Sequence, residues 1–144
     1  MHRHVLHSLA LSALALMASG CAEKLPDFGQ VTGVVTANGK PVKGAVVTFM
    51  PEPSEGNESP INASSMTDDQ GRFELKYGYK DASGVGAPVG WHRVLVLDTR
   101  FSSIPQGGTM PARIFSLDYS SPGTTPLKFE VKPGTQTFDI QVTP

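Results

Sequence analysis

Short segments of alternating apolar and polar residues, separated by glycine, proline and asparagine, dominate this sequence of 144 residues. Side chains of a β-strand point alternately to opposite faces, so a period of two predicts strands with one face in a core. Seven segments show this pattern: 30–36, 45–50, 61–67, 72–76, 91–97, 127–132 and 137–142. Seven short strands joined by turns predict an all-β domain, a seven-stranded antiparallel Greek-key β-sandwich.

Two longer stretches lie between the predicted strands. Residues 78–90 are rich in glycine and predict a loop. Residues 98–125 are long for a loop in a compact domain, but they hold Ile114, Phe115 and Tyr119. We therefore expect this second stretch to pack on the sheet, with a short turn of helix.

The N-terminus resembles a secretory leader. Residues 9–18 are apolar apart from Ser12, and small residues then precede Cys21, the only cysteine. A membrane-spanning helix needs about 20 apolar residues, so this run is too short to be a permanent anchor. It predicts a signal peptide that is removed.

The run Ala18-Ser19-Gly20-Cys21 resembles the lipobox of bacterial lipoproteins, with Ala18 where that motif usually has leucine. The resemblance implies cleavage before Cys21, a diacylglycerol on its sulfur and an acyl chain such as palmitate on its new amine. The alternative is a secreted protein with Cys21 as a free thiol. The expected organisation is a signal peptide at 1–20, a lipidated tether at 21–28 and one domain at 29–144. Ala22 implies an extracytoplasmic place on the outer membrane.

Composition excludes some partners and bonds. The formal net charge is −1, which argues against nucleic acid and against electrostatic binding to anionic lipid. A single cysteine that carries lipid leaves none for a disulfide, so the domain depends on packing. The 15 glycines and 12 prolines favour turns over helices.

Two sequence blocks resemble the carboxypeptidase regulatory-like domains. They are residues 33–49, GVVTANGKPVKGAVVTF, and residues 67–73, TDDQGRF. Residues 126–140 also resemble the C-terminal part of small bacterial lipoproteins with this domain. The resemblance implies a transthyretin-like (prealbumin-like) sandwich and no particular activity. Asn38-Gly39 predicts the turn of a first hairpin, and Gly71 a backbone conformation that other residues adopt at a cost.

The sequence does not predict an enzyme. The serine pairs at 64–65, 102–103 and 120–121 lack the glycines of a nucleophile elbow. His92 is the only histidine beyond the leader, and in a strand we expect it to be packed or at the surface. Related proteins that hydrolyse 5-hydroxyisourate use several histidines and a C-terminal tyrosine motif, which this chain lacks.

Metal and cofactor sites are not expected either. Asp68 and Asp69 could hold calcium loosely, but that cation takes six to eight oxygens, so a turn stabilised by an aspartate is the expected structure. Glu52, Glu55 and Glu58 form an acidic loop that we expect to be solvated.

The expected function is binding. Exposed edge strands of a sandwich can pair with strands of a partner, which predicts a structural or protein-interaction module of the cell envelope. The alternative is a carbohydrate-binding module, in which Trp91 and Tyr119 would form an exposed stacking platform for a glycan. The glycosylation patterns at Asn57 and Asn62 carry no weight behind a bacterial leader.

Overall fold

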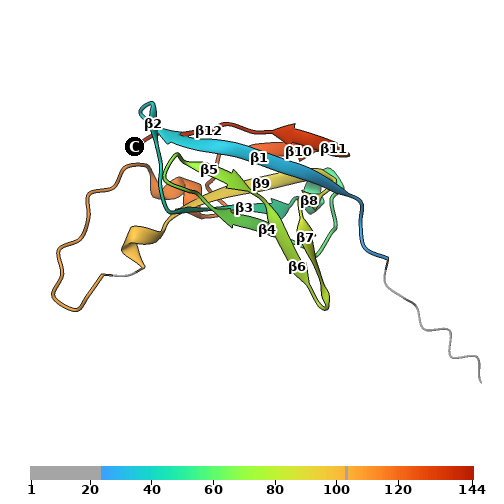
Figure 1. The fold of residues 1–144 in the computed structure, drawn as a ribbon, viewed down its shortest axis with the longest axis horizontal. Coiled ribbons are helices and arrows are strands. Elements are labelled where there is room, and N and C mark those ends of the chain that lie inside the picture. Colours follow the sequence, from blue (N-terminus) through green and yellow to red (C-terminus); the bar gives the residue numbers. More distant parts are fainter. Residues whose placement is uncertain (1–23, 103) are drawn as a thin grey trace, which may run out of the picture.

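The computed structural model describes residues 24–102 and 104–144, which fold into two packed β-sheets (Figure 1). In the first sheet, β1 (Phe28–Ala37) is central. Its neighbours are β11 (Gly134–Thr137) and β12 (Ile140–Val142) along one edge, and β8 (Ala87–Pro88), β5 (Arg72–Glu74) and β2 (Lys40–Pro41) along the other.

The second sheet has the order β10–β9–β3–β4–β6–β7 and is antiparallel throughout. Its strands are β10 (Lys128–Val131), β9 (Gly90–Asp98), β3 (Ala45–Pro51), β4 (Ala63–Met66), β6 (Lys76–Tyr79) and β7 (Ala82–Val85). The other regular elements of the described residues are three 3₁₀ turns: η1 (Pro53–Glu55), η2 (Thr99–Phe101) and η3 (Leu117–Ser120). The predicted all-β sandwich is confirmed, and each of the seven predicted segments contains a strand.

Two details differ from the prediction. β11 and β12 run parallel to β1, so the first sheet is mixed. Residues 78–90 are not a loop, because they contain the end of β6, all of β7 and β8, and the first residue of β9. Gly84 accounts for part of this error: a Cβ there would lie 2.9 Å from the Tyr77 ring, so the glycine that suggests a loop accommodates an aromatic side chain inside a hairpin.

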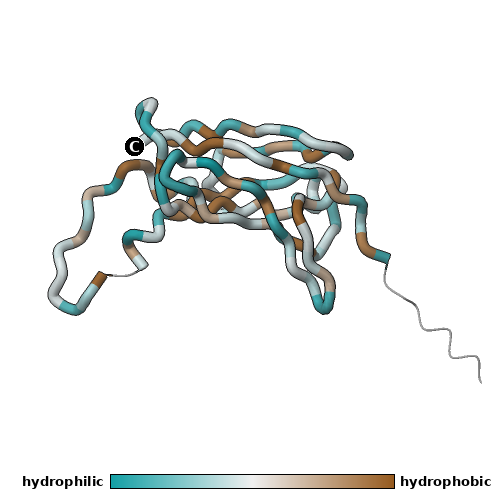
Figure 2. The backbone as a smooth tube through the Cα atoms, viewed as in Figure 1, coloured by the Kyte–Doolittle hydropathy of each residue, from teal (hydrophilic) through white to brown (hydrophobic). Residues whose placement is uncertain are grey.

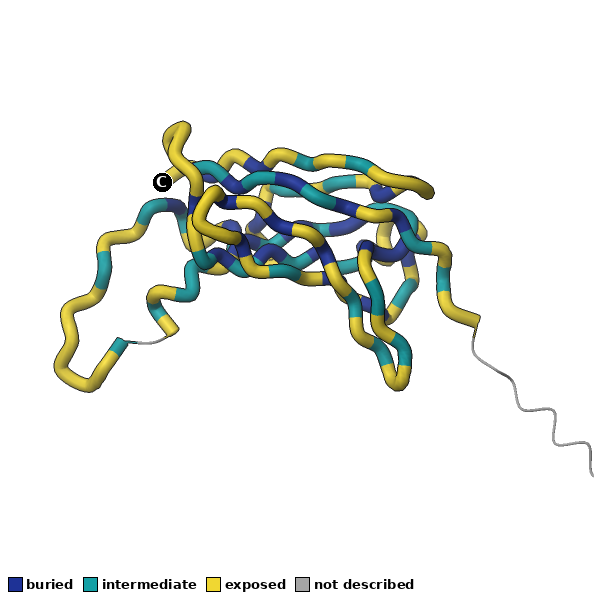
Figure 3. Tube along the Cα trace, in the orientation of Figure 1, coloured by how far each residue is buried: buried dark blue, intermediate teal, exposed yellow. Residues whose placement is uncertain are grey.

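The core lies between the sheets and follows the predicted alternation (Figures 2 and 3). Residues buried from the central strands are Val31, Val35, Val47, Phe49, Val94 and Val96, and the predicted inward residues Phe73 and Leu75 are also buried. Gly33 shares the inner face of β1, where a Cβ would lie 2.0 Å from the Phe138 carbonyl oxygen. Phe138 crosses β1 closely between β11 and β12, which only glycine permits.

The two turns marked by the sequence have the expected backbone. Asn38 and Gly39 both have positive φ, 51° and 74°, and join β1 to β2. Gly71 has φ 71°, and a Cβ there would lie 2.5 Å from the Val35 carbonyl oxygen. This residue therefore needs to be glycine both for its dihedral angle and for the close approach of β1.

The sandwich has two distinct ends. At the entry end, where the chain enters β1 at Phe28, lie β8, the β6–β7 hairpin and the turn at Gly134 (Figure 1). At the far end, where β1 finishes at Ala37, lie the start of β3, the end of β9 and the segment that follows it. Strand register fixes this arrangement, because Ala45 pairs with Asp98 while Pro51 pairs with His92.

The long segment after β9 divides into two parts. Residues 104–113 extend away from the sheets and are mostly exposed, with Met110 at 63% exposure (Figures 1 and 3). From Ile114 the chain returns, and Phe115 and Tyr119 are buried edge to face, with ring centroids 6.1 Å apart. The prediction that the segment packs on the sheet is therefore confirmed for its second part and wrong for residues 104–113.

Candidate functional site

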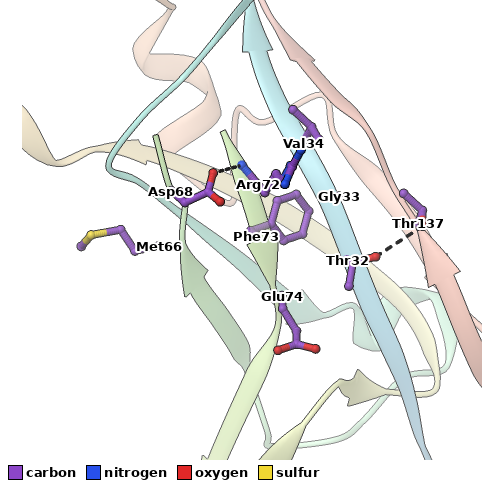
Figure 4. A pocket seen from close by; sticks show the side chains of 9 residues that line it. All are labelled: Thr32, Gly33, Val34, Met66, Asp68, Arg72, Phe73, Glu74 and Thr137. Atoms are coloured by element: carbon purple, nitrogen blue, oxygen red, sulfur yellow. Dashed lines mark hydrogen bonds between the residues drawn. The ribbon is translucent and has the colours of Figure 1, made fainter. Parts of the chain in front are cut away.

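A shallow depression of about 400 Å³ lies beside β1 and β5 of the first sheet and reaches Met66 at the end of β4 (Figure 4). It is lined by Thr32, Gly33, Val34, Met66, Asp68, Arg72, Phe73, Glu74 and Thr137. The Thr32 and Thr137 hydroxyls bond each other at 3.3 Å. Asp68 Oδ1 accepts the backbone N–H groups of Gln70 at 2.9 Å and Arg72 at 2.8 Å. The side chains of Thr32, Thr137 and Asp68 therefore serve the fold.

The far end carries two depressions that share Arg113. The first, of about 400 Å³, is lined by Ala37, Asn38, Lys40, Pro41, Val42, Arg113, Ile114 and Pro144. The second, of about 160 Å³, is lined by Leu97, Asp98, Phe101, Ser102, Arg113, Phe115, Ser116, Leu117 and Ser120. We refer to this second depression as the far-end cavity.

An ion pair between Asp98 and Arg100 borders the far-end cavity. The Arg100 Nη2 lies 2.6 Å from Asp98 Oδ2, and Nε lies 2.9 Å from Oδ1, so the contact is bidentate. The Arg100 guanidinium holds the pKa of Asp98 below its usual value. Arg100 also donates to the Ala112 carbonyl at 3.1 Å, which ties the two arms of the 99–113 segment together. The charges of Asp98 and Arg100 therefore neutralise each other and hold the 99–113 segment in place.

Arg113 lies at the same end and helps to lower the pKa of Asp98, but it makes no ion pair with that carboxylate. Its guanidinium carbon lies 4.6 Å from the centre of the Phe101 ring, a cation–π contact. Among residues 24–102 and 104–144 it forms no hydrogen bond or ion pair within contact distance. Because it lines both depressions, its exposed donors can bind an anionic group at the mouth of the far-end cavity.

Apolar side chains surround this cation. Leu97 and Leu117 are exposed by 44% and 55% and form walls of the cavity, and the buried Phe115 also lines it. Leu97 pairs with Val46, which pairs in turn with the 59% exposed Met66. This row continues the apolar surface across three strands. Sites for small ligands usually have about 300–1,000 Å³, so a cavity of about 160 Å³ fits one protein side chain better.

His92 lies in the core and not in any of these depressions. Its side chain is completely buried on β9, and its ring centroid lies 5.7 Å from that of Phe49. Its Nδ1 lies 2.9 Å from the Gly90 carbonyl oxygen, so we assign the proton to Nδ1, while the buried Nε2 has no partner among the described residues. Burial lowers the pKa of His92 to about 4. The imidazole is therefore neutral near pH 7, and of the two expected places, packed or at the surface, His92 occupies the packed one.

The Asp68–Gly71 turn has the predicted aspartate-stabilised form. Asp69 pairs with Lys43 at 2.6 Å, and both side chains are exposed. In the described parts of the chain, no group of three histidine, cysteine, aspartate or glutamate side chains could hold a metal ion.

The acidic loop is not simply solvated, which corrects the expectation. Glu52 is buried and accepts a 2.6 Å hydrogen bond from the Ser54 hydroxyl and an ion pair from Arg93. The hydrogen bond from Ser54 and, to a smaller extent, the contact with Arg93 lower the pKa of Glu52, although burial raises it. Glu55 pairs with Lys128 of β10, and only Glu58 is exposed without an ion pair among the described residues.

Trp91 and Tyr119 do not form the exposed platform that a sugar site would need. Tyr119 is buried, and its hydroxyl lies 3.1 Å from the Thr143 hydroxyl. Trp91 is partly exposed on β9, where the Lys128 ammonium lies 5.8 Å from its ring centre. The specific aromatic pair named for the carbohydrate-binding alternative is therefore not assembled.

The remaining candidate site residues either form hydrogen bonds that stabilise the fold or lie outside the described residues. Asn57 is buried and donates to the Trp91 carbonyl at 3.0 Å. The Ser120 hydroxyl donates to the Leu117 carbonyl at 2.6 Å. Cys21 and Ser103 lie outside the described residues, so the lipidation site is not described. No helix in the described chain has the length and apolar character needed to cross a membrane.

Comparison with known proteins adds one match. Residues 31–93, from β1 to the start of β9, match a family model described as a domain of unknown function, DUF6795. No curated protein and no solved structure matches the chain. The far-end cavity and Arg113 lie mostly in residues 97–120, beyond the matched range.

Proposed function

We propose that this protein is a lipid-anchored, extracytoplasmic module of the cell envelope that binds another protein and does not catalyse a reaction. The observation that carries the proposal is the far-end cavity, which combines exposed leucines with an arginine that forms no ion pair within contact distance in the described part of the chain. This site lies at the end of the sandwich opposite the entering chain (Figure 1). A chain held at Cys21 would therefore present the cavity away from the membrane.

The lipid anchor rests on the leader and the lipobox-like residues before Cys21. A single acyl chain holds a protein only weakly, while two or more hold it stably, at about 0.8 kcal/mol per buried methylene. A diacylglycerol and a further acyl chain on Cys21 would therefore hold the protein stably at the membrane. With Ala22 after the cysteine, we propose the outer membrane.

The partner that fits this site is a protein segment with an apolar side chain next to a carboxylate. Burial of one leucine-sized side chain contributes about 1.5–3 kcal/mol. A carboxylate would meet the Arg113 guanidinium in a charge-assisted bond, and arginine is among the residues that contribute most at protein interfaces. Lys40, on the neighbouring depression, adds a second positive charge.

The non-catalytic part of the proposal is supported by how the titratable groups are used. His92 is buried and neutral, Glu52 and Asp98 are paired with arginines, and Asp68 stabilises its own turn. Since general acid–base catalysis needs a titratable group that reaches substrate, these side chains favour binding over catalysis. We also propose a carboxypeptidase regulatory-like domain, which the positive φ angles at Gly39 and Gly71 support in both resemblance blocks.

Photo-crosslinking in intact cells tests the docking site. A photoreactive amino acid at Leu117 is expected to give a defined adduct with one envelope protein, and Arg113→Glu should lower its yield about tenfold, equivalent to 1.4 kcal/mol. Leu97→Glu should have a similar effect, because it places a charge in the apolar wall.

Lys132→Glu is the matched control. Lys132 lies near the entry end, its side chain is 72% exposed, and its nearest carboxylate, on Glu130, is 3.8 Å away. The same change of charge there should leave the adduct yield unchanged. Thermal melts of all variants should coincide, which would exclude unfolding. An adduct that persists in Arg113→Glu, or that Lys132→Glu reduces equally, would contradict docking at the far end.

A further inference from the structure

The β6–β7 hairpin projects from the entry end of the sandwich. The strand that begins as β5 pairs with β1 and then, beyond Leu75, continues as β6 and pairs with β4. β4 reaches only Lys76 and Tyr77. Beyond them, β6 pairs only with β7, up to Tyr79 and Ala82, so the outer part of the hairpin stands free of the sheet (Figure 1).

One face of this hairpin is aromatic, and the Lys80 ammonium lies over it, 5.0 Å from the centre of the Tyr79 ring. Register places Tyr77 opposite Gly84 and Tyr79 opposite Ala82, so these four residues share a face. Each of them is partly exposed. The other face carries Lys76, Gly78, Ser83 and Val85, which are all exposed.

The entering chain packs on the aromatic face. The Phe28 ring stacks on the Tyr77 ring, with centroids 3.9 Å apart and planes inclined by 13°. Asp27 is fixed next to it, because its carbonyl accepts the Val89 N–H at 2.8 Å. Leu25, two residues earlier, is 37% exposed. The aromatic face of the hairpin therefore continues onto Phe28, and Leu25 lies three residues before Phe28 in the chain.

The length of the chain brings this surface close to any anchor at Cys21. Asp27 follows Cys21 by six positions, and a fully extended chain of six residues spans at most about 22 Å. The hairpin itself, from Leu75 to Lys80, is about 17 Å long at about 3.3 Å per residue. Even a fully extended tether would therefore place Asp27 only about 22 Å from Cys21, a distance similar to the length of the hairpin.

We propose that the aromatic face of the β6–β7 hairpin, with Phe28 and Leu25, lies in the headgroup region of the bilayer that carries the lipid on Cys21. In the cell this inference rests on the lipid anchor of the proposed function. Tyrosine suits this position, since its ring is apolar and its hydroxyl is polar. The nearby charges almost balance, with Lys24, Lys76 and Lys80 against Asp27 and Asp81, so contact with zwitterionic lipid is expected.

Fluorescence quenching in vesicles tests this contact without relying on processing in the cell. The full chain has one cysteine, so Cys21 can be coupled to a maleimide-bearing lipid in phosphatidylcholine vesicles that contain brominated lipid. Trp91→Phe removes the only native tryptophan. Tyr79→Trp and Ala82→Trp then place the probe on the aromatic face, Ser83→Trp on the opposite face and Leu117→Trp at the far end.

Quenching at positions 79 and 82 is expected to be at least about threefold stronger than at 83 and 117, and insensitive to salt. Equal quenching at all four positions would overturn the proposal, as would stronger quenching at 117. Melting curves identify any variant that does not fold. If one of the two variants on the aromatic face fails to fold, the other still tests the contact. The lipid is attached chemically in this experiment. A negative result would therefore contradict the hairpin contact without testing the natural lipid anchor. Conversely, finding Cys21 unmodified in cells would contradict the natural anchor without changing the result in vesicles.

Discussion

Phe49→Ala is expected to lower the free energy of unfolding by about 3–5 kcal/mol, the usual cost of removing a buried phenylalanine. Phe49 is completely buried on β3, between the two sheets. Its ring centroid lies 5.7 Å from His92, 6.1 Å from Phe138 and 6.2 Å from Phe129, so it joins β9, β10 and the crossing between β11 and β12. A cavity at this position would touch both sheets and could close only if they moved.

Denaturant melts would measure this loss, with Ser64→Ala as the control. Ser64 is exposed on the outer face of β4, opposite Thr48, so its replacement should change the free energy of unfolding by no more than about 0.5 kcal/mol. A loss of several kcal/mol is a large part of the stability of a small domain. Equal effects of the two substitutions would contradict the assignment of inner and outer faces.

Acid is expected to destabilise the protein through His92. The pKa of His92 is about 4 in the folded protein and about 6.5 in the unfolded chain, so the unfolded chain binds more protons between these values. Stability should therefore fall as the pH drops from about 6.5 to about 4. The two pKa values correspond to a loss of about 3 kcal/mol, at 1.36 kcal/mol per pH unit.

His92→Leu separates this effect from other titrations. Glu52 and Asp98, whose pKa values are lowered by Ser54 and Arg93 and by Arg100, lose their contributions only as the pH falls below their unfolded values of 4.5 and 3.8. Between pH 6.5 and 5 the slope of unfolding free energy against pH should belong mainly to His92. The variant should be nearly flat there in urea melts, and a slope equal to that of the natural protein would refute the account.

The sequence was most informative where one face of a strand is buried. At 72–76 and 127–132 the alternation alone identified the inner residues, because water and core impose opposite preferences on neighbouring side chains. Asn38-Gly39 and Asp68–Gly71 were equally clear, since their turns depend on local backbone chemistry. The hairpin at 76–85 was missed because Gly78, Ser83 and Gly84 hide its pattern.

The far-end cavity could not be predicted in the same way. It brings Leu97, Phe101 and Arg113 together through the Asp98–Arg100 ion pair and the bond from Arg100 to Ala112, none of which is periodic. The apolar residues in an unusually long segment were the available signal, and they pointed to packing and not to a cavity. The burial of Glu52 was hidden for a similar reason, because its partner Arg93 lies 41 residues away.

The mass of the N-terminal peptide tests the central claim most directly, since both the anchor and the outward orientation of the far end start from Cys21. Trypsin cleavage after Lys24 of protein purified from membranes should release Cys21-Ala22-Glu23-Lys24. The account predicts that this peptide begins at Cys21 and carries a diacylglycerol on sulfur and an acyl chain on the amine. A mature protein that begins at another residue, or a Cys21 that carries no lipid, would contradict it.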